Sequence, residues 1–399
     1  MGMPLGLYLS VPFCRTKCTY CNFASDVFSR AVFDRYLDRV CADIHTTPES
    51  AGQMGARLER DADSVYLGGG TPTILDSHQL ERLFVTVRQN FRLVPETEIT
   101  VECAPGTLTP AVVETLLRCG VNRVSLGVQS FVDREAASVG RLHKRETVLD
   151  DIVRLRGAGI SNINVDLIAG LPHQTAESWK ESLESVIALG VPHVSVYMLE
   201  VDEDSRLGRE LIAGGTKYHA HFVPDEELTA ELYERACEQL NGAGITQYEI
   251  SNFARGGSES RHNLKYWTRK PYVGFGVDAH SMLKSASEEF AAVRFATADA
   301  LEAYVAGASV QRTEVSRQAA LEETFFLGLR LTRGVDLEQV RSEFGTGVVT
   351  ALGAVLVDLA SFGLIDWEGD WVRLTSRGRL VSNEVFERFL TSGADAVVR

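Results

Sequence analysis

The chain has 399 residues, of which 45% are apolar, enough for one large domain and a smaller one. Its 40 Lys and Arg against 54 Asp and Glu give a formal net charge of −14, which excludes a generic binder of nucleic acids or anionic membranes. No apolar run approaches the ~18 residues of a membrane-spanning helix. The segment ahead of Phe13 is too short for a signal peptide, and the seven cysteines show no regular pairing. These features predict a cytoplasmic protein in a reducing compartment.

Three cysteines follow the first predicted strand, at residues 5–11. Cys14, Cys18 and Cys21 have the spacing C-x3-C-x2-C, and no Cys follows within the next nineteen residues. Three thiolates can ligate three irons of a [4Fe-4S] cluster and leave the fourth iron open to a small molecule. A zinc site would require a fourth ligand nearby, and the nearest His is His45. The spacing favours the cluster, with zinc or a chance arrangement as open alternatives.

Short apolar runs alternate with longer helical patterns up to about residue 199. The predicted strands are 5–11, 64–67, 98–102, 123–127, 162–168 and 193–198. The predicted helices between them are 31–43, 78–90, 110–119, 146–156 and 177–189. Strands that alternate with helices form a parallel sheet with right-handed crossovers. Six such units, rather than eight, predict an α/β fold built on a partial, open (βα)6 barrel.

Polar residues and glycines stand where the predicted strands end, and a βα barrel places its functional residues there. The second strand runs into Gly68-Gly69-Gly70-Thr71-Pro72, where glycines let a ligand approach the backbone, although such a turn is often only a turn. Asp166 lies inside an apolar run and is costly unless it is paired or bound to a ligand. The remaining polar candidates are Glu102, Gln129 and Arg141, whose planar guanidinium suits a carboxylate.

The alternation stops after residue 200. A polar loop is predicted over 202–224 and a helix over 225–241. In the stretch R-H-N-L-K-Y-W, at 261–267, His262 and Tyr266 would share one face of a helical turn. The cations Arg261, Lys265, Arg269 and Lys270 surround them. This segment either holds a flat apolar macrocycle with its carboxylates or forms a buried aromatic cluster with a hydrogen-bonded His, and residue types alone favour the cluster.

From about residue 311 the pattern changes again. Helices are predicted at 322–331, 338–344 and 348–362, a hairpin at 364–374 and a last helix at 383–390. This order indicates a small winged-helix-like α+β domain. It has no basic recognition face, so we expect it to cover a substrate or partner and not to bind nucleic acid. The predicted domains are a barrel at 1–200, a barrel extension at 201–310 and this C-terminal domain at 311–399.

The motifs together resemble the radical S-adenosylmethionine (SAM) superfamily, in the branch that holds oxygen-independent coproporphyrinogen III oxidases and HemW-type haem chaperones. The resemblance rests on V-P-F-C and Y-C-N-F around the cysteines, on G-G-G-T-P, and on Y-E-I-S-N-F-A, H-N-L-K-Y-W and G-F-G-V-D-A-H-S. It implies that SAM binds the open iron and contacts Tyr8, Tyr20, Gly69, Gly70, Thr71, Glu102, Gln129, Arg141 and Asp166. It also implies haem at His262, Tyr266 and Trp267, because H-N-x-x-Y-W is the motif associated with haem.

Two functions follow from this resemblance. The first is a chaperone that delivers haem to a respiratory haem protein, with transient association with membrane-bound acceptors. The second is an oxygen-independent coproporphyrinogen III oxidase, which would cleave SAM. The oxidases have the cysteine pattern C-x3-C-x2-C-x-C, whereas in this chain Phe23 occupies the position of the fourth cysteine. They also carry a longer segment before the cysteines and lack H-N-x-x-Y-W. These differences favour the chaperone, although Ser10 and Cys103-Ala104 depart from the usual residues of the branch.

Overall fold

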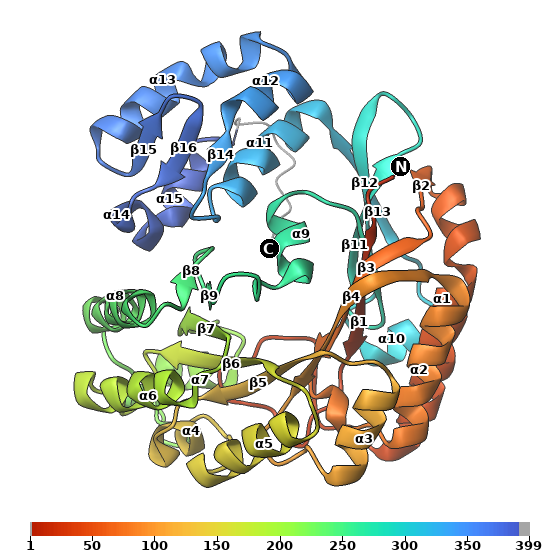
Figure 1. The fold of residues 1–399 in the computed structure, drawn as a ribbon, viewed down its shortest axis with the longest axis vertical. Coiled ribbons are helices and arrows are strands. Elements are labelled where there is room, and N and C mark those ends of the chain that lie inside the picture. Colours follow the sequence, from red (N-terminus) through yellow and green to blue (C-terminus); the bar gives the residue numbers. More distant parts are fainter. Residues whose placement is uncertain (1, 391–399) are drawn as a thin grey trace.

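The computed structural model describes residues 2–390. Its centre is a 13-stranded sheet in the order β13-β12-β11-β10-β1-β3-β4-β5-β6-β7-β9-β8, with β2 (Ala56–Arg57) paired to β11 (Figure 1). Six neighbouring parallel strands form its core: β1 (Leu5–Val11), β3 (Asp61–Gly69), β4 (Arg92–Cys103), β5 (Arg123–Gln129), β6 (Asn162–Ala169) and β7 (His193–Met198). The predicted α/β partial barrel is confirmed. It stays open because β1 and β7 pair with β10 and β9 and not with each other.

Helices cover the outer face of these strands (Figure 1). They are α1 (Phe33–Gln53), α2 (Ser77–Asn90), α3 (Pro110–Arg118), α4 (Asp133–Ser138), α5 (Arg145–Gly157) and α6 (Ala176–Leu189). The expected capping box of α2 is present, since Asp76 and Gln79 bond each other's backbone N–H. Helix α1 runs ten residues past the predicted end at Asp43 and includes Pro48. Burial of Ile44 and Ala51 on its inner face offsets the hydrogen bond that Pro48 cannot donate.

The strands of the partial barrel alternate between an apolar outer face and a polar inner face. On β1, Leu5, Leu7 and Leu9 are buried against the helices. Gly6, Tyr8 and Ser10 point the other way because successive side chains of a strand face opposite sides. The inner faces of neighbouring strands together form a polar interior, here called the lumen, that contains Tyr8, Tyr66, Glu102, Ser125 and Asp166. A polar interior is costly to bury without bound partners and marks the lumen as the functional side of the sheet.

The barrel extension contains more regular structure than expected. The loop predicted over 202–224 is wrong in part, because Ser205 caps a helix, α7 (Arg206–Ala213), that Gly214 ends in a left-handed conformation. The other helices and strands up to residue 310 are α8 (Glu226–Gly242), β8 (Thr246–Gln247), β9 (Asn252–Ala254), α9 (Arg261–Trp267), β10 (Tyr272–Phe275), β11 (His280–Ser285), β12 (Phe290–Ala296) and α10 (Leu301–Val305). Strand β13 (Gln311–Ser316) falls within the predicted C-terminal domain but pairs with β12 at the edge of the large sheet. Strands β10 to β13 were not predicted.

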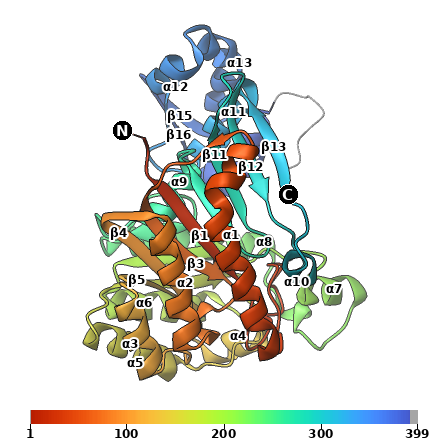
Figure 2. The same cartoon turned by 90° about the vertical axis from the view of Figure 1, so that its right-hand side faces the viewer.

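The C-terminal part has a core of its own, in which Phe325 stacks on Phe389 at 4.7 Å. Its helices are α11 (Arg317–Gly328), α12 (Leu337–Phe344), α13 (Gly347–Ser361), α14 (Ser376–Leu380) and α15 (Ser382–Glu387). The antiparallel sheet β14-β16-β15 consists of Val335–Asp336, Trp371–Leu374 and Ile365–Glu368. These elements confirm a small α+β domain, which lies at one end of the molecule beyond α9 (Figure 2). Residues 391–399 of the predicted domain lie outside the described residues.

Within residues 2–390, no helix combines the length and the apolar character needed to cross a membrane.

Candidate functional site

The three motif cysteines lie in a loop that leaves β1 and is tied to the neighbouring strand ends. Gly70 N–H donates to the Val11 carbonyl at 2.9 Å, and Thr71 N–H donates to the Phe13 carbonyl at 2.8 Å. Beneath the loop, the Phe13 ring stacks on Phe33 with 3.9 Å between centroids. The loop therefore sits on a fixed apolar base, at the end of the lumen where the parallel strands finish.

The thiols of this loop are the half-buried free cysteines Cys14, Cys18 and Cys21. Burial, ahead of any neighbouring group, raises the pKa of Cys14 and of Cys21, so binding iron must displace their protons. Among the described residues, no three His, Cys, Asp or Glu side chains converge on a single metal ion. A cubane does not require such convergence, because each thiolate binds a different iron at its own corner.

The glycine turn after β3 leaves room beside the cysteines. A Cβ on Gly70 would lie 2.7 Å from the Val11 carbonyl oxygen and 3.1 Å from Cys14 Sγ, and Gly69 has a φ of +98°. Only glycine fits these two positions without displacing the loop. The turn therefore brings backbone next to the thiols, as a site for a cluster and its small-molecule ligand requires.

Glu102 joins this turn to the lumen. Its carboxylate accepts hydrogen bonds from Gly69 N–H at 3.1 Å and from the Tyr66 hydroxyl at 2.8 Å. Burial raises the pKa of Glu102 to about 7, more than the Tyr66 hydrogen bond lowers it. Tyr8 lies on the adjacent strand, with its ring centroid 6.1 Å from that of Tyr66. The structure thus brings together three of the predicted residues and adds Tyr66, which was missed although it shares the period-two inner face of β3.

Two further predicted residues converge at the end of β5. A Cβ on Gly127 would lie 3.1 Å from both Arg141 Nη2 and Gln129 Nε2. Arg141 Nη2 donates to the Tyr20 hydroxyl at 3.2 Å, which links it to the cysteine loop. The Nε of Arg141 is buried and has no hydrogen-bond partner among residues 2–390, so this guanidinium keeps a free donor. Such a donor fits the carboxylate of SAM.

Asp166 is half-buried on β6 and held by neighbours. Its two oxygens accept hydrogen bonds from Asn164 Nδ2 at 2.7 Å and from Ser125 Oγ at 3.2 Å. Burial is the main cause that raises its pKa. Asp166 and Glu102 thus face the same interior as two carboxyl groups that resist ionisation, suited to hydroxyl or cationic groups of a ligand.

The H-N-L-K-Y-W segment forms α9, as the spacing of His262 and Tyr266 predicts. This helix lies at the end of the lumen opposite the cysteine loop. The N–H groups of Arg261 and His262 donate to the carboxylate of Glu98, in the middle of β4 and in register with Ser64 on β3. Ser64 Oγ on β3 contacts His262 Nδ1 at 3.0 Å. From Ser64 to Gly70 the strand spans about 20 Å, at ~3.3 Å per residue. The cysteines and α9 therefore close different ends of the partial barrel.

The side chains of α9 point in different directions. His262 is buried, with one ring nitrogen on Ser64 and the other 2.8 Å from the Tyr266 hydroxyl. Lys265 is also buried and contacts Asp63 at 2.6 Å and the Pro4 carbonyl at 2.8 Å. Arg269 is paired with Glu323 and Glu343. Lys265 and Arg269 are therefore both engaged with other groups of the protein. Trp267 and Arg269 line a cavity.

The chain matches known proteins over most of its length. The Radical SAM superfamily model matches residues 8–186, and the HemN C-terminal domain model matches residues 315–381. Heme chaperone HemW of Bacillus subtilis (strain 168) is 35% identical over 390 residues, which cover 96% of this chain and 98% of that protein. The chain belongs to the HemW family of the radical SAM superfamily.

Other similarities agree with membership of the HemW family. Heme chaperone HemW of Mycobacterium tuberculosis (strain ATCC 25618 / H37Rv) is 32% identical and covers 98% of this chain and 95% of its own. The solved structure of coproporphyrinogen III oxidase (HemN) from Escherichia coli has a TM-score of 0.82 at 24% identity and covers 97% of this chain and 90% of that one. At that identity the likeness shows a shared fold. Membership of the superfamily implies a [4Fe-4S] cluster and SAM, and the donor set described above fits both.

Proposed function

We propose that this protein is a haem chaperone, with haem as its cargo and a [4Fe-4S] cluster and SAM as resident cofactors. The observation that carries this proposal is the near full-length similarity to proteins named heme chaperone HemW, at 35% and 32% identity. Cys14, Cys18 and Cys21 would ligate the cluster, which would supply the capacity to transfer an electron to SAM. Phe23, which stands where the oxidases have a fourth cysteine, is 65% exposed and has no sulfur to offer.

Different residues of the chain would bind different chemical groups of SAM. Arg141 would take the carboxylate through its free Nε donor, while Tyr20 orients the guanidinium. Gly69, Gly70 and Thr71 would present backbone groups to the amino end. Glu102 and Asp166 would take hydroxyl or cationic groups from inside the lumen, with Gln129 and Tyr8 beside them. Helix α9 closes the other end and so keeps bulk water from entering there.

Haem would bind next to α9, where the H-N-x-x-Y-W motif lies. His262 and Tyr266 are hydrogen-bonded to each other inside the lumen and would keep α9 in place. Trp267 would contact the haem. We further propose that the protein works in the cytoplasm and passes haem to a respiratory haem protein, including acceptors at the membrane. The units 1–200, 201–310 and 311–399 would then serve the cofactors, the cargo and the covering of the cargo.

The test is anaerobic reconstitution of the cluster followed by two separate incubations. Haemin is titrated and followed by the Soret band, and coproporphyrinogen III is incubated with SAM and a reductant and assayed for decarboxylated product. Saturable haem binding without decarboxylation is expected. Decarboxylation, or no saturable haem binding, would overturn the proposal.

A further inference from the structure

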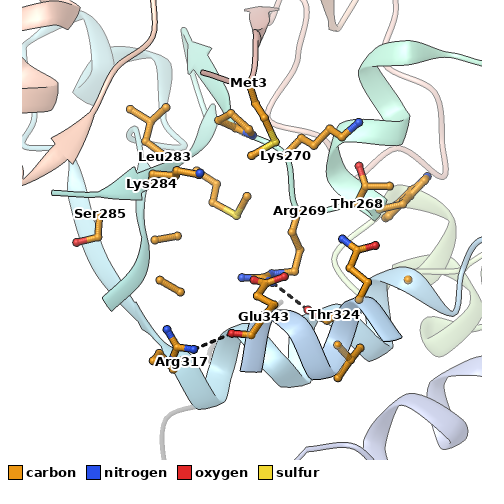
Figure 3. A pocket seen from close by; sticks show the side chains of 18 of the residues that line it. Met3, Thr268, Arg269, Lys270, Leu283, Lys284, Ser285, Arg317, Thr324 and Glu343 are labelled. Atoms are coloured by element: carbon orange, nitrogen blue, oxygen red, sulfur yellow. Dashed lines mark hydrogen bonds and ion pairs between the residues drawn. The ribbon is translucent and has the colours of Figure 1, made fainter. Parts of the chain in front are cut away.

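A cavity of about 940 Å³ lies between the barrel extension and the C-terminal domain. Figure 3 shows the connection from α9 to β10 and the strand β11 on one side, and the C-terminal helices that carry Thr324 and Glu343 on the other. No cysteine of the motif and no residue assigned to SAM lines it. Its volume falls at the upper end of the ~300–1,000 Å³ of small-molecule sites, which also favour domain boundaries.

The wall of the cavity combines aromatic and thioether groups. Trp267 lines it beside Met3, Met282 and Leu283. The indole N–H of Trp267 is buried and has no acceptor within residues 2–390, so it stays available to a ligand. Arg330 lies 4.4 Å from the centroid of the indole ring and helps to hold it in place. A flat apolar ligand would find both a planar surface and polarizable sulfur here.

The cavity is connected to the rest of α9 through one layer of packing. Tyr266 packs edge-to-face on Tyr272, with 4.7 Å between ring centroids. Tyr272 in turn pairs across the sheet with Met282, which lines the cavity. The H-N-x-x-Y-W motif therefore supplies one wall residue, Trp267, and one residue directly behind the wall, Tyr266.

The cavity is positively charged in a chain whose formal net charge is −14. Six Lys and Arg residues line it, against three Asp and Glu. Arg269 and Arg317 are engaged, since Arg269 Nη1 contacts Thr324 and Glu343, and Arg317 donates to the Glu343 carbonyl at 2.7 Å (Figure 3). The side chains of Lys270, Lys284 and Arg333 are exposed and make no hydrogen bond or ion pair in the described part of the chain.

We propose that this cavity is the haem site, with the porphyrin against Trp267 and Met282 and its propionates at Lys270, Lys284 and Arg333. The ligand class follows from the combination, since a large planar apolar ring with carboxylates at one edge satisfies both the aromatic wall and the unpaired cations. Among residues 2–390, neither His nor Cys lines the cavity, and the thioethers of Met3 and Met282 are the side chains there that can ligate haem iron. This inference rests on the proposed function, to which it adds the location of the haem site.

The first test compares charge reversal inside and outside the cavity. The double variant Lys270→Glu/Lys284→Glu is matched by Lys180→Glu/Lys217→Glu, whose lysines are exposed and line no part of the cavity. Haemin is titrated into each anaerobically reconstituted protein at low and high salt. The cavity variant should bind about tenfold more weakly or worse, with a smaller salt dependence, because its cations no longer attract the propionates. The matched variant should stay within about twofold of wild type.

A second variant fills the cavity without removing any charge. Ala291 lines the cavity from β12, and Ala291→Trp should abolish saturable haem binding while the iron and sulfide content of the cluster stays at the wild-type level. Wild-type haem affinity in both this variant and the double charge reversal would overturn the inference and leave the proposed function standing. Absence of haem binding by the wild type would overturn both.

Discussion

The Nε2 atom of His262 lies 2.8 Å from the hydroxyl oxygen of Tyr266, and both residues belong to the motif associated with haem. This bond, together with that from Ser64 to Nδ1, occupies both ring nitrogens inside the lumen. His262→Ala should therefore lower the free energy of unfolding by about 2–4 kcal/mol, because it leaves a cavity and two hydroxyls without partners. Tyr266→Phe should cost about 1–3 kcal/mol. Urea unfolding measures both, with His45→Ala as an exposed control, and a loss of less than 0.5 kcal/mol, or about the control level, would contradict the assignment.

The same histidine gives stability a pH dependence. Burial, followed by the positive charges of Lys265 and Arg123, lowers the pKa of His262 to about 3. Below about pH 6.5 the unfolded chain takes up a proton that the folded chain refuses until about pH 3, so stability falls as the pH falls across this window. The contribution is at most about 5 kcal/mol at the acid end. His262→Gln should flatten the unfolding midpoints between pH 4 and pH 6.5, and an unchanged slope would argue against a neutral buried ring.

Glu102 should give the stability a pH dependence of the opposite sign to that caused by His262. Its pKa is about 7 in the folded chain, mainly through burial, so in SAM-free protein stability falls as the pH rises from about 4.5 to about 7. The loss amounts to about 3 kcal/mol. Glu102→Gln should remove this slope in cofactor-free protein and weaken SAM binding after reconstitution. Glu49→Gln, on an exposed part of α1, is the control and should change neither.

The cluster should depend on three cysteines and on no others. The triple variant Cys14→Ala/Cys18→Ala/Cys21→Ala should retain almost no iron and sulfide after anaerobic reconstitution, whereas Cys237→Ala should keep the wild-type content. Cys237 is the matched control because it is also half-buried and free. Full retention in the triple variant would refute the assignment of ligands.

Arg141→Lys should weaken SAM binding by about 10- to 100-fold, because a lysine ammonium cannot reproduce the planar array of donors beside Gly127. Arg145→Lys, on an arginine paired with Glu181 at the surface, should leave SAM binding unchanged. Equilibrium dialysis with SAM and the change of the cluster's EPR signal measure both. Equal affinities of the two variants would place the SAM carboxylate elsewhere.

The central strands and the strand-end residues were predictable because their signals are local in the sequence. Period-two alternation marks β1 and β3, and Glu102 and Asp166 stand out as acids in apolar runs. The orientation of α9 was not predictable, because it depends on Glu98 and Ser64, which are about 160 to 200 residues away in the sequence. The strands β11 to β13 form by antiparallel pairing beyond β10, and the cavity they border joins Met3 to Arg333 across almost the whole chain.

Strand β4 carries Glu98, which holds the N-terminus of α9, and Glu102, which holds the glycine turn beside the cysteines. The two carboxylates lie four residues apart on one face of one strand, so a displacement of β4 along its axis would move both ends of the lumen together. If SAM binding shifted β4, the affinity of the proposed haem site would change, and haem would then change the affinity for SAM by the same factor, because coupling between two ligands is reciprocal. The release of haem and the occupancy of the SAM site would then be controlled by the same equilibrium.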